Sequence, residues 1–185
     1  MRKLIIAMGC LLSMSTLAAE PFSMELSGIK MGQILPKKQV FNGFGCQGQN
    51  ISPAINWKNP PTGTKSFALT MYDPDAPTGS GWWHWVVVNI PASLNYLPEN
   101  FGQANQTLPE HLKTILQSRT DFGTQGYGGP CPPIGHGTHR YIFTLYALKT
   151  EKLEIKPDTP AAMVGYLIHS NQLGSTRFET KFERK

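Results

Sequence analysis

Apolar and aromatic residues of this chain gather in short runs that are separated by turns. The densest runs are residues 66–72 (SFALTMY), 83–89 (WHWVVVN) and 141–148 (YIFTLYAL). Aromatic and β-branched side chains favour extended backbone, and glycine, proline and aspartate lie close to these runs, as is typical of strands that end in turns. The pattern therefore predicts three buried strands at the centre of a mainly β protein.

Weaker alternation predicts further strands on either side of these three. Residues 22–26 and 50–57 alternate apolar and polar positions, and Pro53 places the second of them near a sheet edge. Residues 175–183 alternate phenylalanine with charged residues and predict a closing strand.

Two segments have the spacing of helices. Residues 108–117 predict a short helix with a proline in its first turn. For a second helix over residues 161–173, Thr159 is the expected N-cap, Pro160 the first helical residue and Gly174 the stop. Its apolar stripe comprises Val164, Leu167 and Ile168.

Residues 1–19 have the plan of a secretory signal peptide, with a basic start, an apolar run and two small residues at the end. Cleavage after Ala18 and cleavage after Ala19 both fit this plan. No later segment has the ~20 apolar residues of a membrane span. We therefore expect a periplasmic or secreted protein without a membrane span, in which residues 20–185 form one domain.

Composition and charge narrow the class of protein. The chain has 18 glycines and 15 prolines, which favour short strands joined by turns over long helices. Its formal net charge is +5, but the basic residues are dispersed along the sequence. A nucleic-acid partner is not expected, because nucleic-acid interfaces concentrate basic residues on one face.

The number and positions of the cysteines also fit an exported protein. Cys10 falls within the signal peptide, which leaves Cys46 and Cys131 as an even pair in an oxidising compartment. A disulfide between them would close a loop of about 85 residues and clamp the turn around Cys131. Two free thiols are the alternative that the sequence leaves open.

Acids, histidines and indoles cluster at two proline-rich turns, residues 73–77 and 128–133. If the neighbouring strands lie in one sheet, Asp73, His84 and His139 converge at one edge. A carboxylate beside two imidazoles favours the imidazolium form, which suits a phosphate or carboxylate ligand. Strand alternation further predicts that Trp82 and His84 share one face, while Trp83 and Trp85 share the other.

These turns resemble the signature blocks of the phosphatidylethanolamine-binding protein family, also called the Raf kinase inhibitor protein family. The matching blocks are residues 73–77 (DPDAP), 81–89 (GWWHWVVVN), 129–133 (GPCPP) and 139–141 (HRY). Residues 50–53 (NISP) and 126–129 (GYGG) are similar to the bacterial YbhB/YbcL-type branch. The likeness extends over roughly residues 24–183.

The resemblance implies a large antiparallel sheet packed on a smaller sheet, with a few peripheral helices including one near the C-terminus. It also implies a non-enzymatic binding protein without a cofactor, whose small pocket takes a phosphate-like or carboxylate anion. A phospholipid headgroup or a phosphorylated side chain would carry that anion, and a kinase or a protease would be the protein partner. By position, the pocket residues are Asp73, Pro77, Trp82, His84, Pro133, His139 and Tyr141, while Asp75 holds the turn.

Two other classes of function remain as alternatives. A metal-dependent hydrolase would use Asp73, His84, His136 and His139 as mixed nitrogen and oxygen ligands. The sequence has no His-Glu-x-x-His motif, Gly-x-Ser-x-Gly elbow or Walker loop to support it, and we expect no metal site. An interaction module, such as a homodimer, would use an exposed face and leave the pocket vestigial.

Overall fold

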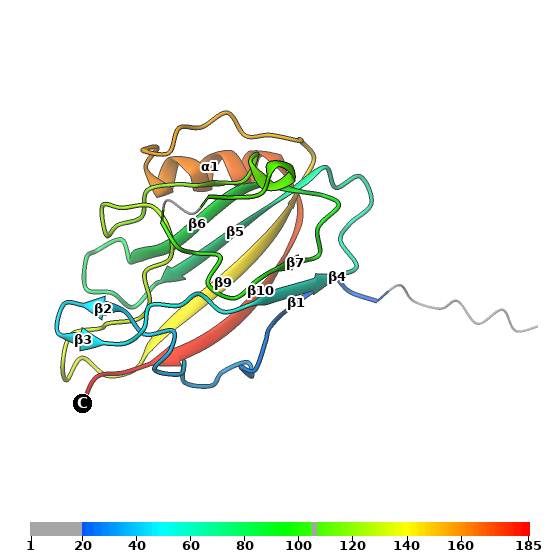
Figure 1. Ribbon diagram of the computed structural model, residues 1–185. Coiled ribbons are helices and arrows are strands. Elements are labelled where there is room, and N and C mark those ends of the chain that lie inside the picture. The colour runs from blue at the N-terminus through cyan, green and yellow to red at the C-terminus, as the bar shows by residue number, and fades with distance from the viewer. Residues whose placement is uncertain (1–19, 105–106) are drawn as a thin grey trace, which may run out of the picture.

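A five-stranded antiparallel sheet forms the centre of the computed structural model, which describes residues 20–104 and 107–185 (Figure 1). The order of its strands is β10 (Gln172–Phe182), β9 (His139–Leu148), β5 (Ser66–Asp73), β6 (Trp82–Pro91) and β8 (Leu116–Gln117). The three dense apolar runs are the inner strands β9, β5 and β6, as predicted. The predicted signal peptide lies outside the described residues.

A smaller sheet packs on one face of the large sheet. It has the order β1 (Ser23–Leu26), β4 (Ile55–Lys58) and β7 (Tyr96–Leu97), and a short hairpin of β2 (Asn42–Gly43) and β3 (Cys46–Gln47) lies apart from it. Alternate residues of both sheets, such as Trp57 and Phe143, are buried in one apolar core between them. The predicted fold, a large antiparallel sheet on a smaller one, is confirmed.

Helix α1 (Ala161–Asn171) covers the other face of the large sheet (Figure 1). Val164 and Ile168 are fully buried against β6 and β9, so the predicted stripe is confirmed. The predicted N-cap is wrong, because the Thr159 hydroxyl accepts a hydrogen bond from the Lys156 N–H instead. Among the described residues, no helix is long and apolar enough to cross a bilayer.

The helix predicted over residues 108–117 is wrong. Only a 3₁₀ turn, η1 (Glu110–Leu112), forms there, and the chain then extends as β8 along the edge of β6. The Gln117 side chain accepts a hydrogen bond from Trp85 Nε1 at 2.6 Å. Pairing with the sheet edge thus outweighs a weak helical propensity, since tertiary contacts often override local preference.

A disulfide joins Cys46 of β3 to Cys131 in the loop before β9, with the two Cα atoms 6.0 Å apart. This is the predicted pair. The bridge fastens the β2–β3 hairpin to the second proline-rich turn. Because 85 positions separate the cysteines, the bridge removes much of the freedom of the unfolded chain.

Replacing both cysteines, as Cys46→Ser with Cys131→Ser, is expected to lower the free energy of unfolding by on the order of 4 kcal/mol. The cause is the freedom that an 85-residue loop regains in the unfolded chain. Urea denaturation with and without reductant measures the effect. Reduced wild-type protein should match the variant, and a wild-type midpoint that reductant leaves unchanged would contradict the prediction.

Candidate ligand-binding site

A β-bulge in β6 positions His84. Met71 of β5 lies opposite Trp85 and Tyr72 lies opposite Trp83, which leaves His84 as an extra residue between the two pairs. The bulge turns Trp83 toward the helix side of the sheet, while Trp85 stays in the core between the sheets. The prediction that Trp83 and Trp85 share a face is therefore wrong, because the extra residue shifts the alternation.

The first proline-rich turn is tied to β9 by an ion pair. Arg140 donates from Nε and Nη2 to the two carboxylate oxygens of Asp75, at 2.9 and 2.7 Å, and its backbone N–H adds a third hydrogen bond. The guanidinium holds the pKa of Asp75 below its usual value. Asp75 thus holds the turn, as predicted, and fixes Asp73 relative to His139.

The second turn is held by Asn50, from the NISP block. The Asn50 side chain donates to the Tyr127 carbonyl at 2.9 Å and accepts from the Gly129 N–H at 2.7 Å. A Cβ atom at Gly129 would collide with the backbone of Gln39, so this close approach requires glycine. The NISP and GYGG blocks therefore work together to place the turn beside β6.

The two turns and the three inner strands enclose a cavity of about 210 Å³. All seven residues predicted for the pocket line it: Asp73, Pro77, Trp82, His84, Pro133, His139 and Tyr141. The structure thus brings Asp73, His84 and His139 together from three strands. Their part in binding a ligand remains a prediction.

Asp73 begins a hydrogen-bonded row that runs from the interior to the surface. His139 Nδ1 lies 2.7 Å from Asp73 Oδ2, and His139 Nε2 lies 2.7 Å from Nδ1 of the exposed His136. The other Asp73 oxygen accepts the Asp75 N–H at 2.8 Å. Both oxygens of the carboxylate and both ring nitrogens of His139 are therefore engaged within the protein.

His84 is neutral near pH 7. Its Nδ1 lies 2.7 Å from the Gly128 carbonyl oxygen, and burial lowers its pKa to about 4. The Asp73 carboxylate acts in the opposite direction, but the loss of hydration outweighs it. The imidazolium form that the sequence predicts is therefore wrong for His84.

Two buried hydrogen-bond donors of the cavity wall lack a partner. Trp82 Nε1 and the Tyr141 hydroxyl form no hydrogen bond with any part of the chain that the structure describes. Burial raises the pKa of Tyr141, and the charge of Asp73 raises it further, so the hydroxyl stays protonated. Leaving such donors unpaired costs stability, so an acceptor atom that reached them would stabilise the protein.

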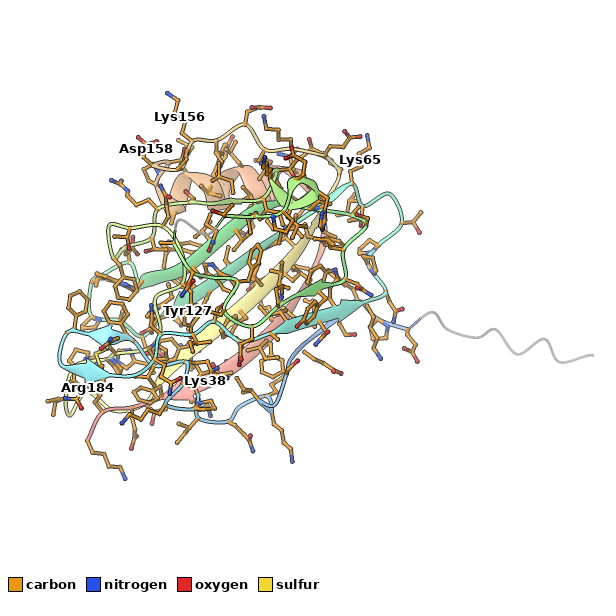
Figure 2. The ribbon with its side chains drawn as sticks, viewed as in Figure 1. Lys38, Lys65, Tyr127, Lys156, Asp158 and Arg184 are labelled. Atoms are coloured by element: carbon orange, nitrogen blue, oxygen red, sulfur yellow. A yellow bond between two sulfur atoms is a disulfide. The ribbon has the colours of Figure 1, made fainter. Side chains whose placement is uncertain are left out.

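Sequence reasoning missed two aromatic residues that line the cavity, Phe44 and Phe122. Phe122 stands edge-on to His84 and to Trp82, at centroid distances of 5.2 and 5.4 Å. Phe44, next to the disulfide, stacks on Phe122 at 5.9 Å. Arg184, labelled beside the β2–β3 hairpin in Figure 2, donates to the Phe44 carbonyl at 3.1 Å and holds this rim.

The histidines and acids of the site do not converge on a point where a metal ion would bind. Within residues 20–104 and 107–185, no three His, Cys, Asp or Glu side chains form such a group. Asp73, His139 and His136 instead follow one another in a row, and a backbone carbonyl occupies Nδ1 of His84. The arrangement suits hydrogen bonding to a small group.

The profile of the phosphatidylethanolamine-binding protein family matches residues 27–183. The chain belongs to this family. The resemblance seen in the DPDAP, GWWHWVVVN and GPCPP blocks is therefore confirmed, and the cavity lies where those blocks meet.

Bacterial relatives extend over nearly the same length. UPF0098 protein YbcL of Escherichia coli K12 is 48% identical over 168 residues, which are 90% of each chain. UPF0098 protein YbhB of the same organism is 50% identical over 154 residues, 83% of this chain and 95% of YbhB. Both agree with the YbhB/YbcL-type branch that the sequence indicates.

Two crystal structures share the family fold. That of E. coli YbcL covers 89% of this chain and 99% of its own, with a TM-score of 0.84 and 48% identity. That of CT736 from Chlamydia trachomatis covers 89% and 98%, with a TM-score of 0.72 and 26% identity.

The burial of neutral His84 predicts a pH-dependent stability. An unfolded histidine takes up a proton near pH 6.5, whereas folded His84 does so only near pH 4. The unfolded state therefore binds more protons between these values, and stability falls as the pH falls from about 6.5 to 4, by up to roughly 3 kcal/mol from this group. Urea denaturation across this range measures the loss.

The variant His84→Asn serves as the comparison, because its amide can still donate to Gly128 but does not titrate. Its stability should depend less on pH over the same range. If the free energy of unfolding changed equally with pH in wild type and variant, His84 would not be a buried neutral group.

Proposed function

We propose that this protein is an exported, non-enzymatic binding protein whose cavity holds a phosphate-like or carboxylate group. The observation that carries the proposal is that two residues lining the cavity, Trp82 and Tyr141, have buried donors, Nε1–H and O–H, without partners in the described part of the chain. Charged acceptors form stronger hydrogen bonds than neutral ones, so an anionic oxygen is the partner that gains most there.

The size of the cavity limits what enters it. Pockets that enclose drug-sized ligands usually measure 300 Å³ or more, whereas this cavity measures about 210 Å³. A phosphate group or a headgroup fits, and the rest of a larger ligand would stay outside. Two exposed apolar residues, Phe44 of the cavity wall and Ile134, which follows the lining residue Pro133, offer a surface for that remainder.

The chemistry of the wall favours binding over catalysis. Each carboxylate oxygen of Asp73 and each ring nitrogen of His139 already has a hydrogen-bond partner within the protein. The Thr78 hydroxyl, which also lines the cavity, donates to the Gly81 carbonyl. Among the described lining residues, none combines a free nucleophile with a base that activates it.

Export is supported by two independent features. Residues 1–19 follow the signal-peptide pattern, and the Cys46–Cys131 bridge is of the kind that persists in oxidising compartments. A phospholipid headgroup or a phosphorylated protein side chain is then the proposed carrier of the anion. A kinase or protease partner would have to meet the protein outside the cytoplasm.

Titration of the mature protein with inorganic phosphate, followed by tryptophan fluorescence and calorimetry, tests the proposal. Binding should be weakened roughly tenfold or more in Tyr141→Phe, because a hydrogen bond to a charged group is lost. Tyr146→Phe on the same strand is the matched control, since Tyr146 packs under helix α1 and away from the cavity.

A flat titration of folded wild-type protein would contradict the proposal. It would favour an interaction module with a vestigial cavity, for which the oligomeric state would be the next measurement. Equal weakening in both tyrosine variants would remove Tyr141 from the binding site.

A further inference from the structure

The tautomer of His84 is fixed by its surroundings. The Gly128 carbonyl oxygen can only accept, so the proton must sit on Nδ1 of His84. The Gly128 N–H in turn donates to the His84 carbonyl at 2.9 Å, so two hydrogen bonds link the same two residues. A Cβ atom at position 128 would collide with Phe122, which restricts this contact to glycine.

A neutral His84 with its proton on Nδ1 has a lone pair on Nε2. None of the hydrogen bonds formed by the described residues uses this nitrogen, and the ring lines the cavity between Phe122 and Tyr141. The titratable groups near it are Asp73 on β5 with His139 and Tyr141 on β9. Asp73 and His139 are already paired with each other.

Residues that line the cavity therefore have two donors and one acceptor without a partner in the described part of the chain. Trp82 Nε1–H and Tyr141 O–H require acceptor oxygens, whereas His84 Nε2 requires a hydrogen. An oxygen without a hydrogen would face the Nε2 lone pair and be repelled. A group that satisfies all three positions needs both bare oxygens and one hydroxyl.

We propose that the cavity selects a phosphate group that carries a hydroxyl hydrogen, and that His84 Nε2 accepts this hydrogen. The inference rests on the proposed function and narrows its ligand class. It favours inorganic phosphate and phosphomonoesters, such as a phosphorylated side chain, over sulfate and over phosphodiesters that carry no donor.

Calorimetric titration with two matched pairs of anions tests the inference. At about pH 8, inorganic phosphate and sulfate are both mainly dianions, but only phosphate keeps a hydroxyl. At about pH 5, methyl phosphate and dimethyl phosphate are both mainly monoanions, since monoesters lose their second proton near pH 6. In each pair the hydroxyl-bearing anion is expected to bind roughly 10- to 100-fold more tightly.

The pH dependence separates the two hydroxyl-bearing ligands. Methyl phosphate should bind more weakly as the pH rises through about 6, because its only hydroxyl hydrogen is lost. Inorganic phosphate should retain most of its affinity over the same range. Equal affinities within both pairs of anions would overturn the inference and leave the proposed function standing, whereas absence of binding by every anion would overturn both.

The variant His84→Asn tests whether Nε2 of His84 causes the preference for phosphate over sulfate. It keeps a donor for Gly128 but has no Nε2, so the ratio of phosphate to sulfate affinity should fall toward one. His169→Asn on helix α1 is the control, because His169 Nδ1 also lies 2.7 Å from a backbone carbonyl, that of Gly165, far from the cavity. An unchanged ratio in His84→Asn would overturn the assignment.

A measurement on the wild-type protein does not depend on the folding of any variant. The ¹⁵N chemical shift of neutral His84 distinguishes a free Nε2 from one that accepts a hydrogen bond. Phosphate should shift the Nε2 resonance toward the value of a nitrogen that accepts a hydrogen bond, whereas sulfate should not change it. The same response to both anions would contradict the proposed role of Nε2.

Discussion

The pair of hydrogen bonds between His84 and Gly128 is the constraint on which the cavity depends. One end lies in the β6 bulge and the other in the turn that leads to β9, so the pair joins segments that are 44 positions apart. The same contact fixes the proton on Nδ1, whereas burial of the ring keeps it neutral. Position and tautomer of His84 thus have one physical cause, and its charge has another. Asp73 and His139 reach the same cavity by the register of the neighbouring strands.

The site combines groups that are fully paired with groups that are not. Asp73 has two hydrogen-bonding neighbours, the Asp75 N–H and His139 Nδ1, and the Asp75–Arg140 pair ties its turn to β9. Trp82 Nε1 and the Tyr141 hydroxyl remain buried without a partner. The paired groups hold the wall in place, whereas the unpaired ones cost stability. Polar groups that cost stability in this way are often found where function requires them.

Much of the fold and the outline of the site could be predicted from the sequence. The inner strands follow from dense aromatic and β-branched runs, and strand ends beside proline-rich turns place Asp73 and His139 correctly. The bulge at His84 leaves no signal in an apolar run, so regular alternation predicts the wrong face for Trp83. The neutral state of His84 could not be predicted either, because it depends on how completely the folded chain excludes water. Phe44 and Phe122 lie in loops whose approach depends on long-range contacts.

The disulfide has a consequence for when the cavity becomes complete. Cys131 is at once half of the bridge and part of the cavity wall, next to Pro132 and Phe44. Before the bridge forms, this part of the wall is not yet tethered to the β2–β3 hairpin. The wall of the cavity is therefore complete only after the two thiols are oxidised, a reaction that oxidising compartments permit.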